Sequence, residues 1–187
     1  MLIQKPYNRA RAVEYAKTWA LSRNPLFFDF TGIGGNCTNF VSQCLLAGSC
    51  TMNYTPGVGW YYISSNDRAP AWSSVEYLYD FLTQKFANEN GGIGPFATDV
   101  PREMAEIGDV VQYANAEGDW YHTVIITGKD GDEILVSAQS NDALDRPIST
   151  YNFAAARFLH IEGVRISLND DICYSILLRG GVDENRT

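Results

Sequence analysis

The sequence lacks the features that mediate membrane insertion and nucleic-acid binding. No stretch approaches the roughly 18 consecutive apolar residues that indicate a transmembrane helix. The chain has only 14 Lys and Arg residues against 22 acidic ones, which gives a formal net charge of −8, and the basic residues form no run. Nucleic-acid binding depends on neutralising phosphates, and an anionic membrane repels an acidic surface. We therefore expect neither as a partner.

The first 20 residues also lack the apolar region of a signal peptide. Lys5, Arg9, Arg11 and Lys17 are spread through this segment instead. As written, the chain is expected to be cytoplasmic. If it is a piece of a longer exported protein, an extracellular or cell-wall location is expected.

Metal ligands are scarce as well. The 4 cysteines show no Cys-x-x-Cys spacing, and only 2 histidines could join them. We expect no zinc site on this basis, and no other cofactor. Cys44 and Cys50 lie close enough in sequence to pair as a disulfide, which spacing alone does not decide.

The composition present is that of an ordinary globular domain. With 187 residues, 45% of them hydrophobic and 19% charged, the chain is long enough to bury a substantial core. We expect one domain, residues 1–187.

Helical periodicity dominates the first half of the sequence and strand periodicity the second. A helix is predicted over residues 7–23, ended by Asn24-Pro25. A second begins near Cys37, and a third follows the capping-box pattern Ser73-x-x-Glu76 and stops at Asn90-Gly91-Gly92. Strands are predicted at 109–113, 120–127, 133–138, 158–166 and 172–178, with a polar loop at 139–149. Helices followed by an antiparallel meander make an α+β domain.

The stretch with the clearest chemical potential surrounds Cys37. Gly34-Gly35 allows a sharp turn, and apolar residues then recur on one helical face. Cys37 is therefore expected at a helix N-terminus, where free amide groups and the helix dipole favour the nucleophilic thiolate. The alternative is a structural role, because cysteine often serves as a small core residue.

A cysteine nucleophile needs a base, and only two histidines are candidates. His122 lies near the start of a strand, directly after a polar turn, where an imidazole can face a cleft. His160 lies in an apolar strand segment and is interpreted as a structural sheet residue. His122 is therefore the predicted base.

The group that would orient His122 is sought at the end of the following strand. Hairpin pairing around a turn near Asp130 places position 138 opposite His122. Strict alternation favours Ser140 or Asp142, and a bulge would favour Gln139 or Asn141. Asn141 and Asp142 are also ordinary loop residues. Cysteine at a helix start, then histidine, then an amide or carboxylate is the order of a papain-type hydrolase.

Several segments of the sequence resemble a known family. They are Tyr7-Asn8-Arg9-x-x-Ala12-Val13-x-Tyr15-Ala16, Asn24-Pro25, the run Gly35-Asn36-Cys37-Thr38-Asn39-Phe40-Val41-Ser42-Gln43, Gly108-Asp109-Val110-Val111 and His122-Thr123-Val124-Ile125. Over roughly residues 7–150, the chain resembles the putative amidase domain of bacterial proteins. That domain is related to the papain-like CHAP and NlpC-type cell-wall hydrolases.

The resemblance implies a papain-like fold in which N-terminal helices pack on an antiparallel sheet. It implies Cys37 as nucleophile and His122 as general base and acid. The third member would come from Asn141-Asp142, and we assign Asn141. The sequence departs from the family pattern twice, with Asn36 where aspartate is common and Gln139 where histidine is common.

The function predicted on these grounds is hydrolysis of an amide bond, in peptidoglycan or its peptides, without a cofactor. Trp60, Tyr61, Tyr62 and Trp120 are candidates for lining the cleft, and each could equally be a core residue. The main alternative is a non-catalytic domain that binds a peptide or a partner. A transferase or deamidase with the same Cys37 and His122 pair is a third hypothesis.

Overall fold

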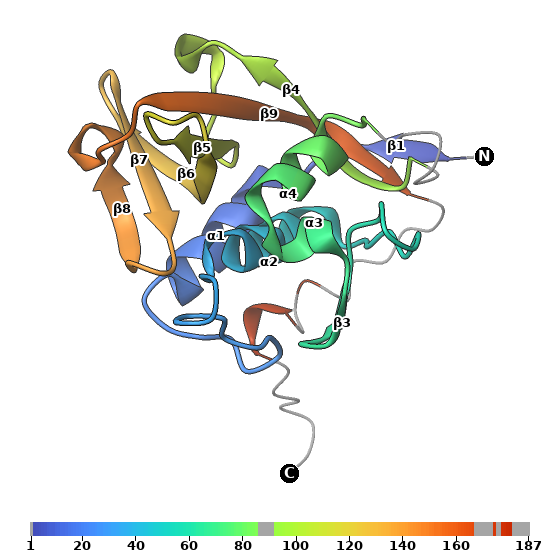
Figure 1. Ribbon diagram of the computed structural model, residues 1–187. Coiled ribbons are helices and arrows are strands. Elements are labelled where there is room, and N and C mark those ends of the chain that lie inside the picture. The colour runs from blue at the N-terminus through green and yellow to red at the C-terminus, as the bar shows by residue number, and fades with distance from the viewer. Residues whose placement is uncertain (1, 86–91, 167–173, 175–176, 181–187) are drawn as a thin grey trace.

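The computed structural model describes residues 2–85, 92–166, 174 and 177–180. Within them the protein is an α+β domain with a seven-stranded sheet and a small two-stranded one. Every pairing between the described strands is antiparallel. The predicted α+β class is therefore confirmed (Figure 1).

The helices are shorter and more numerous than the sequence pattern predicts. The structure contains α1 (Arg9–Trp19), α2 (Cys37–Ser49), α3 (Pro70–Ser73) and α4 (Val75–Leu82), with 3-10 turns η1 (Arg102–Met104) and η2 (Ile148–Thr150). Asn8 caps α1 by accepting a hydrogen bond from the Arg11 amide at 3.1 Å. The predicted capping box is wrong, because Ser74 is the N-cap of α4 and Ser73 Oγ accepts from Arg68 Nε at 2.9 Å.

The seven-stranded sheet is built around its last strand. The strands are β1 (Ile3–Lys5), β4 (Gly94–Val100), β5 (Val110–Ala114), β6 (Trp120–Asp130), β7 (Glu133–Ala138), β8 (Ala143–Pro147) and β9 (Ala155–Ile166); β2 (Tyr62–Ser64) and β3 (Asp67–Arg68) form the small sheet. The order is β1-β9-β5-β6-β7-β8, and β4 also pairs with β9. In Figure 1, β9 crosses the view above the helices.

Some strand predictions are corrected. The predicted loop 139–149 contains β8, which returns along β7 with Ala138 opposite Ala143. In the predicted strand 172–178, the described residues Tyr174, Leu177 and Leu178 are helical. Residues 172, 173, 175 and 176 lie outside the described residues.

Each face of the sheet contributes to a separate apolar core. The helices α1, α2 and α4 pack on one face, where Phe40, Leu45, Leu78 and Ile125 are fully buried. The opposite face forms a second cluster that includes Tyr113, Val124, Ile126 and Phe158. Alternate residues of β6 thus enter different cores, as the pleat of a strand requires.

Candidate active site

The helix α2 begins where the sequence pattern predicts. Gly34 and Gly35 adopt φ of +88° and +99°, which glycine tolerates without a Cβ clash. The chain then enters the helix, and the Phe40 amide donates to Asn36 O at 2.9 Å. All residues of α2 are buried, and Cys37, its first residue, is 9% exposed. The predicted position of Cys37 at a helix N-terminus is confirmed.

Cys37 opens onto a cleft of about 340 Å³. The glycine turn, the α3–α4 junction and the start of β6 line this cleft, with residues Gly34, Gly35, Cys37, Ser73, Ser74, Val75, Glu76, Trp120 and Tyr121. The sequence pattern was interpreted as a capping box at residues 73–76, and it did not predict that these residues line the cleft. The adjacent serines Ser73 and Ser74 are the signal that could have indicated a junction between two helices there.

Asn36, directly before Cys37, holds the start of α2 in place. Its Oδ1 accepts hydrogen bonds from the Phe30 amide at 3.0 Å and from Asn39 Nδ2 at 2.8 Å. Its Nδ2 donates to Gln139 Oε1, and its backbone amide donates to Ser140 Oγ. Asn36 is the N-cap of α2, yet its side chain makes no capping hydrogen bond. The first-turn amides of α2 therefore lack a side-chain cap.

His122 is buried on β6 in an aromatic environment. A bulge at Tyr121 separates the pairs Ala114–Trp120 and Tyr113–His122. The imidazole ring lies 5.9 Å from the Tyr113 ring, 6.1 Å from Tyr151 and 6.3 Å from Tyr121, between ring centroids. Burial, and secondarily the positive charge of Arg146, lower the pKa of His122 to about 4. The imidazole is therefore neutral at pH 7.

The segments that carry Cys37 and His122 contact each other, but the two side chains face different surroundings. The residues that follow them, Thr38 and Thr123, share a hydrogen bond of 3.0 Å between their Oγ1 atoms. Thr123 faces α2, so His122, the adjacent strand residue, faces the tyrosine cluster. Within the described residues no hydrogen bond joins His122 to Cys37, whose Sγ lies 3.8 Å from Thr38 Oγ1.

The four candidates for an orienting group take different roles at the end of β7. Gln139 is buried and bonded to Asn36, whereas Ser140 accepts from the Asn36 amide. Ser140 and Asn141 have φ of +64° and +107° and turn the chain into β8. Asn141 is exposed, and among the described residues its side chain makes no hydrogen bond. Asp142 accepts from both terminal nitrogens of Arg23, at 2.9 and 3.0 Å.

The other histidine belongs to a buried ionic cluster. His160 Nδ1 lies 2.9 Å from Asp109 Oδ2, and Arg9 Nη1 lies 2.6 Å from Asp109 Oδ1. Asp109 is fully buried and also accepts from the amides of Glu106 and Ile161. The apolar neighbours of His160 in sequence did not indicate these polar partners. The cluster ties α1 to β5 and β9, which is a structural arrangement.

Cys44 and Cys50 do not line the cleft. Cys44 is a free, fully buried thiol in the middle of α2, and burial raises its pKa well above the ordinary value. Cys50 is disulfide-bonded, so Cys44 and Cys50 do not pair with each other. Among the described residues, no group of three or more His, Cys, Asp or Glu could hold a metal ion.

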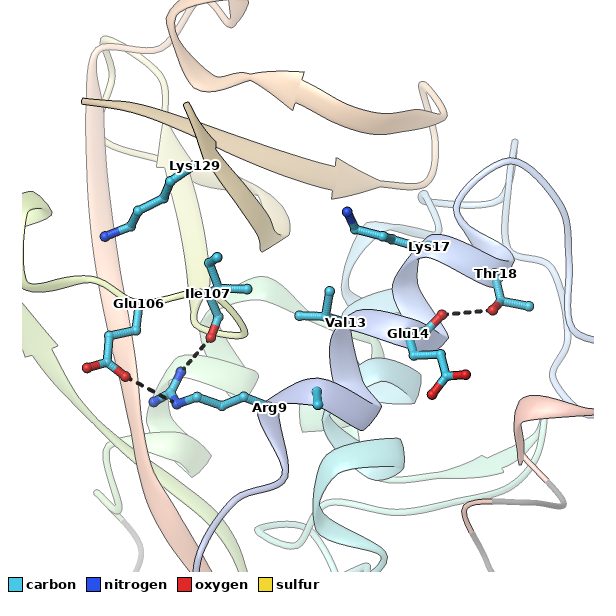
Figure 2. A pocket seen from close by; sticks show the side chains of 9 residues that line it. Arg9, Val13, Glu14, Lys17, Thr18, Glu106, Ile107 and Lys129 are labelled. Carbon is cyan, nitrogen blue, oxygen red and sulfur yellow. Dashed lines mark hydrogen bonds and ion pairs between the residues drawn. The ribbon is translucent and has the colours of Figure 1, made fainter. Parts of the chain in front are cut away.

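A second, larger concavity lies elsewhere. A groove of about 1010 Å³ separates α1 from the segment before β5 and from β6, and it is lined by Arg9, Ala10, Val13, Glu14, Lys17, Thr18, Glu106, Ile107 and Lys129. Figure 2 shows Val13 and Ile107 on its facing walls. Arg9, Lys17 and Lys129 bond to Asp109, Asp145 and Ala105 O. The residues that line this groove include no cysteine and no histidine, so the cleft at Cys37 is the candidate active site.

The fold and the cleft define an α+β domain with a cysteine at the start of a buried helix. The profile of the putative amidase domain matches residues 6–161, and the chain belongs to this family. The uncharacterized protein YhbB of Bacillus subtilis (strain 168) is 34% identical over 141 residues. The match covers 73% of this chain and 42% of that protein, so the chain spans less than half of its relative. No solved structure matches the chain significantly.

No helix in the described part of the chain is long and apolar enough to cross a membrane. Of the aromatic residues proposed for the cleft, Trp60 is fully buried in the core, whereas Trp120 lines the cleft.

Proposed function

We propose that this protein is a papain-like cysteine amidase that hydrolyses an amide bond with the Cys37 thiolate. Family membership supports amide hydrolysis in general. The observation that supports the cysteine mechanism is the position of Cys37 as the first residue of α2, where it opens onto the cleft. A thiolate in this position lies at the positive end of the helix dipole.

The uncapped start of α2 supports the proposal in a second way. The Asn36 side chain bonds to Phe30, Asn39 and Gln139 rather than to the helix amides. The amides of the first turn are therefore available to a substrate oxygen. In the proposed step, Cys37 Sγ bonds to the carbonyl carbon, and the oxyanion is held by these amides. Expulsion of the protonated amine leaves a thioester, which water hydrolyses.

His122 is the proposed base and acid for these steps. General-base catalysis requires its imidazole within hydrogen-bond reach of Cys37 Sγ, and such contacts often form only with substrate bound. The ring must therefore turn from the tyrosine cluster toward the cleft. β7 pairs with β6 only from Ile125 onward, so the strand edge beside His122 has no β7 partner. Leaving the aromatic pocket would also raise the pKa of His122, since burial is the main cause of its depression.

The assignment of Asn141 as the orienting group stays a prediction. Its position at the tip of the β7–β8 turn leaves the side chain exposed. It can join His122 only if the turn and the imidazole approach each other in the substrate complex.

A peptide amide is the proposed substrate class, with cell-wall peptides as its first representative. The cleft offers the aromatic side chains of Trp120 and Tyr121 beside the serines of the α3–α4 junction. Aromatic surfaces and short polar groups suit a peptide backbone with small side chains. The cell-wall origin of that peptide rests on the family resemblance alone.

The decisive experiment is thiol labelling with iodoacetamide at pH 7 without reductant, read by peptide mass spectrometry. Cys37 is expected to label at least about tenfold faster than the free, buried Cys44 of the same protein. His122→Ala is expected to slow peptide hydrolysis, because in the proposed mechanism the imidazole reaches Cys37 in the substrate complex. Incubation with synthetic stem peptides should then give products and, with a slow ester analogue, an acyl group on Cys37. Slow labelling of Cys37, or peptide hydrolysis that is unchanged in His122→Ala, would contradict the mechanism.

The second candidate is a non-catalytic peptide-binding domain. It is favoured by one observation: among the described residues, no ionisable side chain bonds to Cys37 Sγ, whose polar neighbour is the Thr38 hydroxyl. On this hypothesis Cys37→Ala binds stem peptides as tightly as the intact protein, and neither protein cleaves them. Titration calorimetry on both proteins, followed by product analysis, distinguishes the two functions.

A further inference from the structure

Two buried amides, Asn36 and Gln139, meet directly beside the candidate nucleophile. Asn36 is 0% exposed and Gln139 is 1% exposed. Asn36 Nδ2 donates to Gln139 Oε1.

The orientation of Gln139 is determined by its other partners. Its Nε2 donates to Trp19 O, in the last residue of α1, at 2.7 Å and to Ser22 O, just beyond the helix, at 2.8 Å. Backbone carbonyls only accept, so both hydrogens of this amide group are committed. The oxygen of Gln139 must therefore face Asn36, and position 36 must supply a donor.

The orientation of Asn36 is determined independently. Its Oδ1 accepts from the Phe30 amide and from Asn39 Nδ2, both of which can only donate. Its Nδ2 is thus left to face Gln139. Each side-chain amide is oriented by two other partners. In the hydrogen bond between Asn36 and Gln139, Asn36 can therefore only donate and Gln139 can only accept.

We propose that Asn36 and Gln139 form a positioning pair that sets the location of Cys37 by a one-directional hydrogen bond. The pair joins the end of α1, the loop at Phe30 and the end of β7 to the residue that precedes Cys37. The Asn36 amide is further fixed by Ser140 Oγ. This role rests on the proposed function, because it concerns the nucleophile of that reaction.

The proposal explains why the N-cap of α2 is not used for capping. A capping asparagine normally bonds to an amide of the first turn and so occupies the groups that would hold an oxyanion. Here the pair turns the Asn36 side chain away from the helix axis and toward Gln139. The helix loses one cap, and the first-turn amides stay open to the cleft beside Cys37.

The pair also carries no charge. Two charged residues near it, Arg23 after Ser22 and Asp142 after Gln139, bond to each other at the surface, and Arg23 also pairs with Asp29. An aspartate at position 36 would place a carboxylate oxygen against Gln139 Oε1, so that two acceptors face each other in a buried site. It would also put a negative charge next to the Cys37 thiolate. Histidine at position 139 would restore a donor toward that aspartate.

The test compares Asn36→Asp, the double variant Asn36→Asp/Gln139→His and the control Asn53→Asp. Asn53 is also buried and donates to Ile93 O, but it follows the C-terminal end of α2. The readouts are the pH profile of iodoacetamide labelling at Cys37 and the melting temperature. Asn36→Asp is expected to slow labelling at pH 7 about tenfold or more and to shift its midpoint to higher pH. The double variant is expected to recover to within about threefold of the original rate.

The control is expected to lower the melting temperature without changing the labelling profile. The proposal is overturned if folded Asn36→Asp labels like the original protein, or if a folded double variant labels no faster than Asn36→Asp. If Asn36→Asp does not fold, Gln139→Glu decides. In Gln139→Glu, a carboxylate oxygen faces the carbonyls of Trp19 and Ser22. The proposal requires that this variant slow Cys37 labelling more than Asn53→Asp does. Measuring the labelling rates requires no substrate. They therefore test the positioning pair even if the proposed amide hydrolysis is not found.

Discussion

The two free cysteines of α2 lie on one helix in opposite situations. Cys37 stands at the N-terminus, beside polar side chains and a cleft, whereas Cys44 is fully buried two helical turns later in the apolar core. Burial raises the pKa of Cys44, because a thiolate there would lose its hydration. The same residue type on the same helix is thus placed for chemistry at one end and for packing in the middle.

The prediction with the largest expected effect concerns the removal of each thiol in turn. Cys37→Ala is expected to lower amide hydrolysis about a thousandfold or more, since the reaction loses its nucleophile. Cys44→Ala is expected to keep the rate within about threefold and to lower stability by roughly 1 kcal/mol. Steady-state rates and denaturant unfolding measure both. Equal losses of activity would abolish the distinction between the two sites.

A second prediction concerns acid, which acts on the His122 side of the sheet. The folded pKa of about 4 lies below the unfolded value of about 6.5, so the unfolded chain binds a proton that the folded protein excludes. This contribution to the free energy of unfolding is full above pH 6.5 and falls by about 3 kcal/mol as the pH drops through the window toward 4. His122→Phe is expected to remove this part of the pH dependence, and denaturant titrations from pH 7 to 4 measure it. Identical slopes in both proteins would refute it.

A third prediction tests how tightly the packed end of α2 is held. A Cβ on Gly48 would lie 2.3 Å from Tyr7 Cε2, so a buried ring would have to move. Gly48→Ala is expected to cost about 2 kcal/mol of stability by thermal or denaturant unfolding. In a Tyr7→Ala background the same substitution should cost almost nothing. A full cost in that background would assign the effect to something other than this contact.

The smallest prediction concerns the link between the cysteine and histidine segments. Thr38→Val removes the 3.0 Å hydrogen bond to Thr123, and a loss of about 1 kcal/mol is expected. Thr123 keeps Gln112 Nε2 as a partner at 3.3 Å. A double-mutant cycle with Thr123→Val should return a similar coupling energy. A cycle without coupling would show that the hydroxyl contact contributes nothing to the position of Cys37.

Periodic patterns were sufficient to predict the elements that carry the candidate site. The spacing after Gly34-Gly35 predicts α2 from its first residue, and the alternation of residues 133–138 predicts β7 within its observed bounds. Helix α2 is buried over its whole length, and Ile134, Val136 and Ala138 of β7 lie in the second core, so the apolar spacing of both segments reports burial. Strand β8 carries charged residues and was predicted as a loop, because its edge position leaves no apolar alternation.

The side-chain arrangement was harder to predict than the elements. A bulge near Thr127 lies between the β6–β7 pairs Ile126–Val136 and Gly128–Leu135. The turn between β6 and β7 also lies later than predicted, with Asp130 opposite Glu133. The predicted pairing of His122 with position 138 is wrong for this reason, and the observed register places Ile125 opposite Ser137. Whether an imidazole faces the helices or the tyrosines depends on such single-residue shifts. The Asn36 and Gln139 contact was equally hidden, because it joins residues 103 positions apart.

The central position of β9 has a consequence for how the chain is made. β9 pairs with β1, β4 and β5, and Ile166 lies opposite Ile3 at the other end of the sequence. During synthesis, the N-terminal strand and the helices around Cys37 emerge long before their shared partner. The sheet cannot close until the ribosome has passed residue 166, and contacts so distant in sequence fold slowly. The nascent chain must hold an incomplete, partly apolar sheet until its last strand arrives.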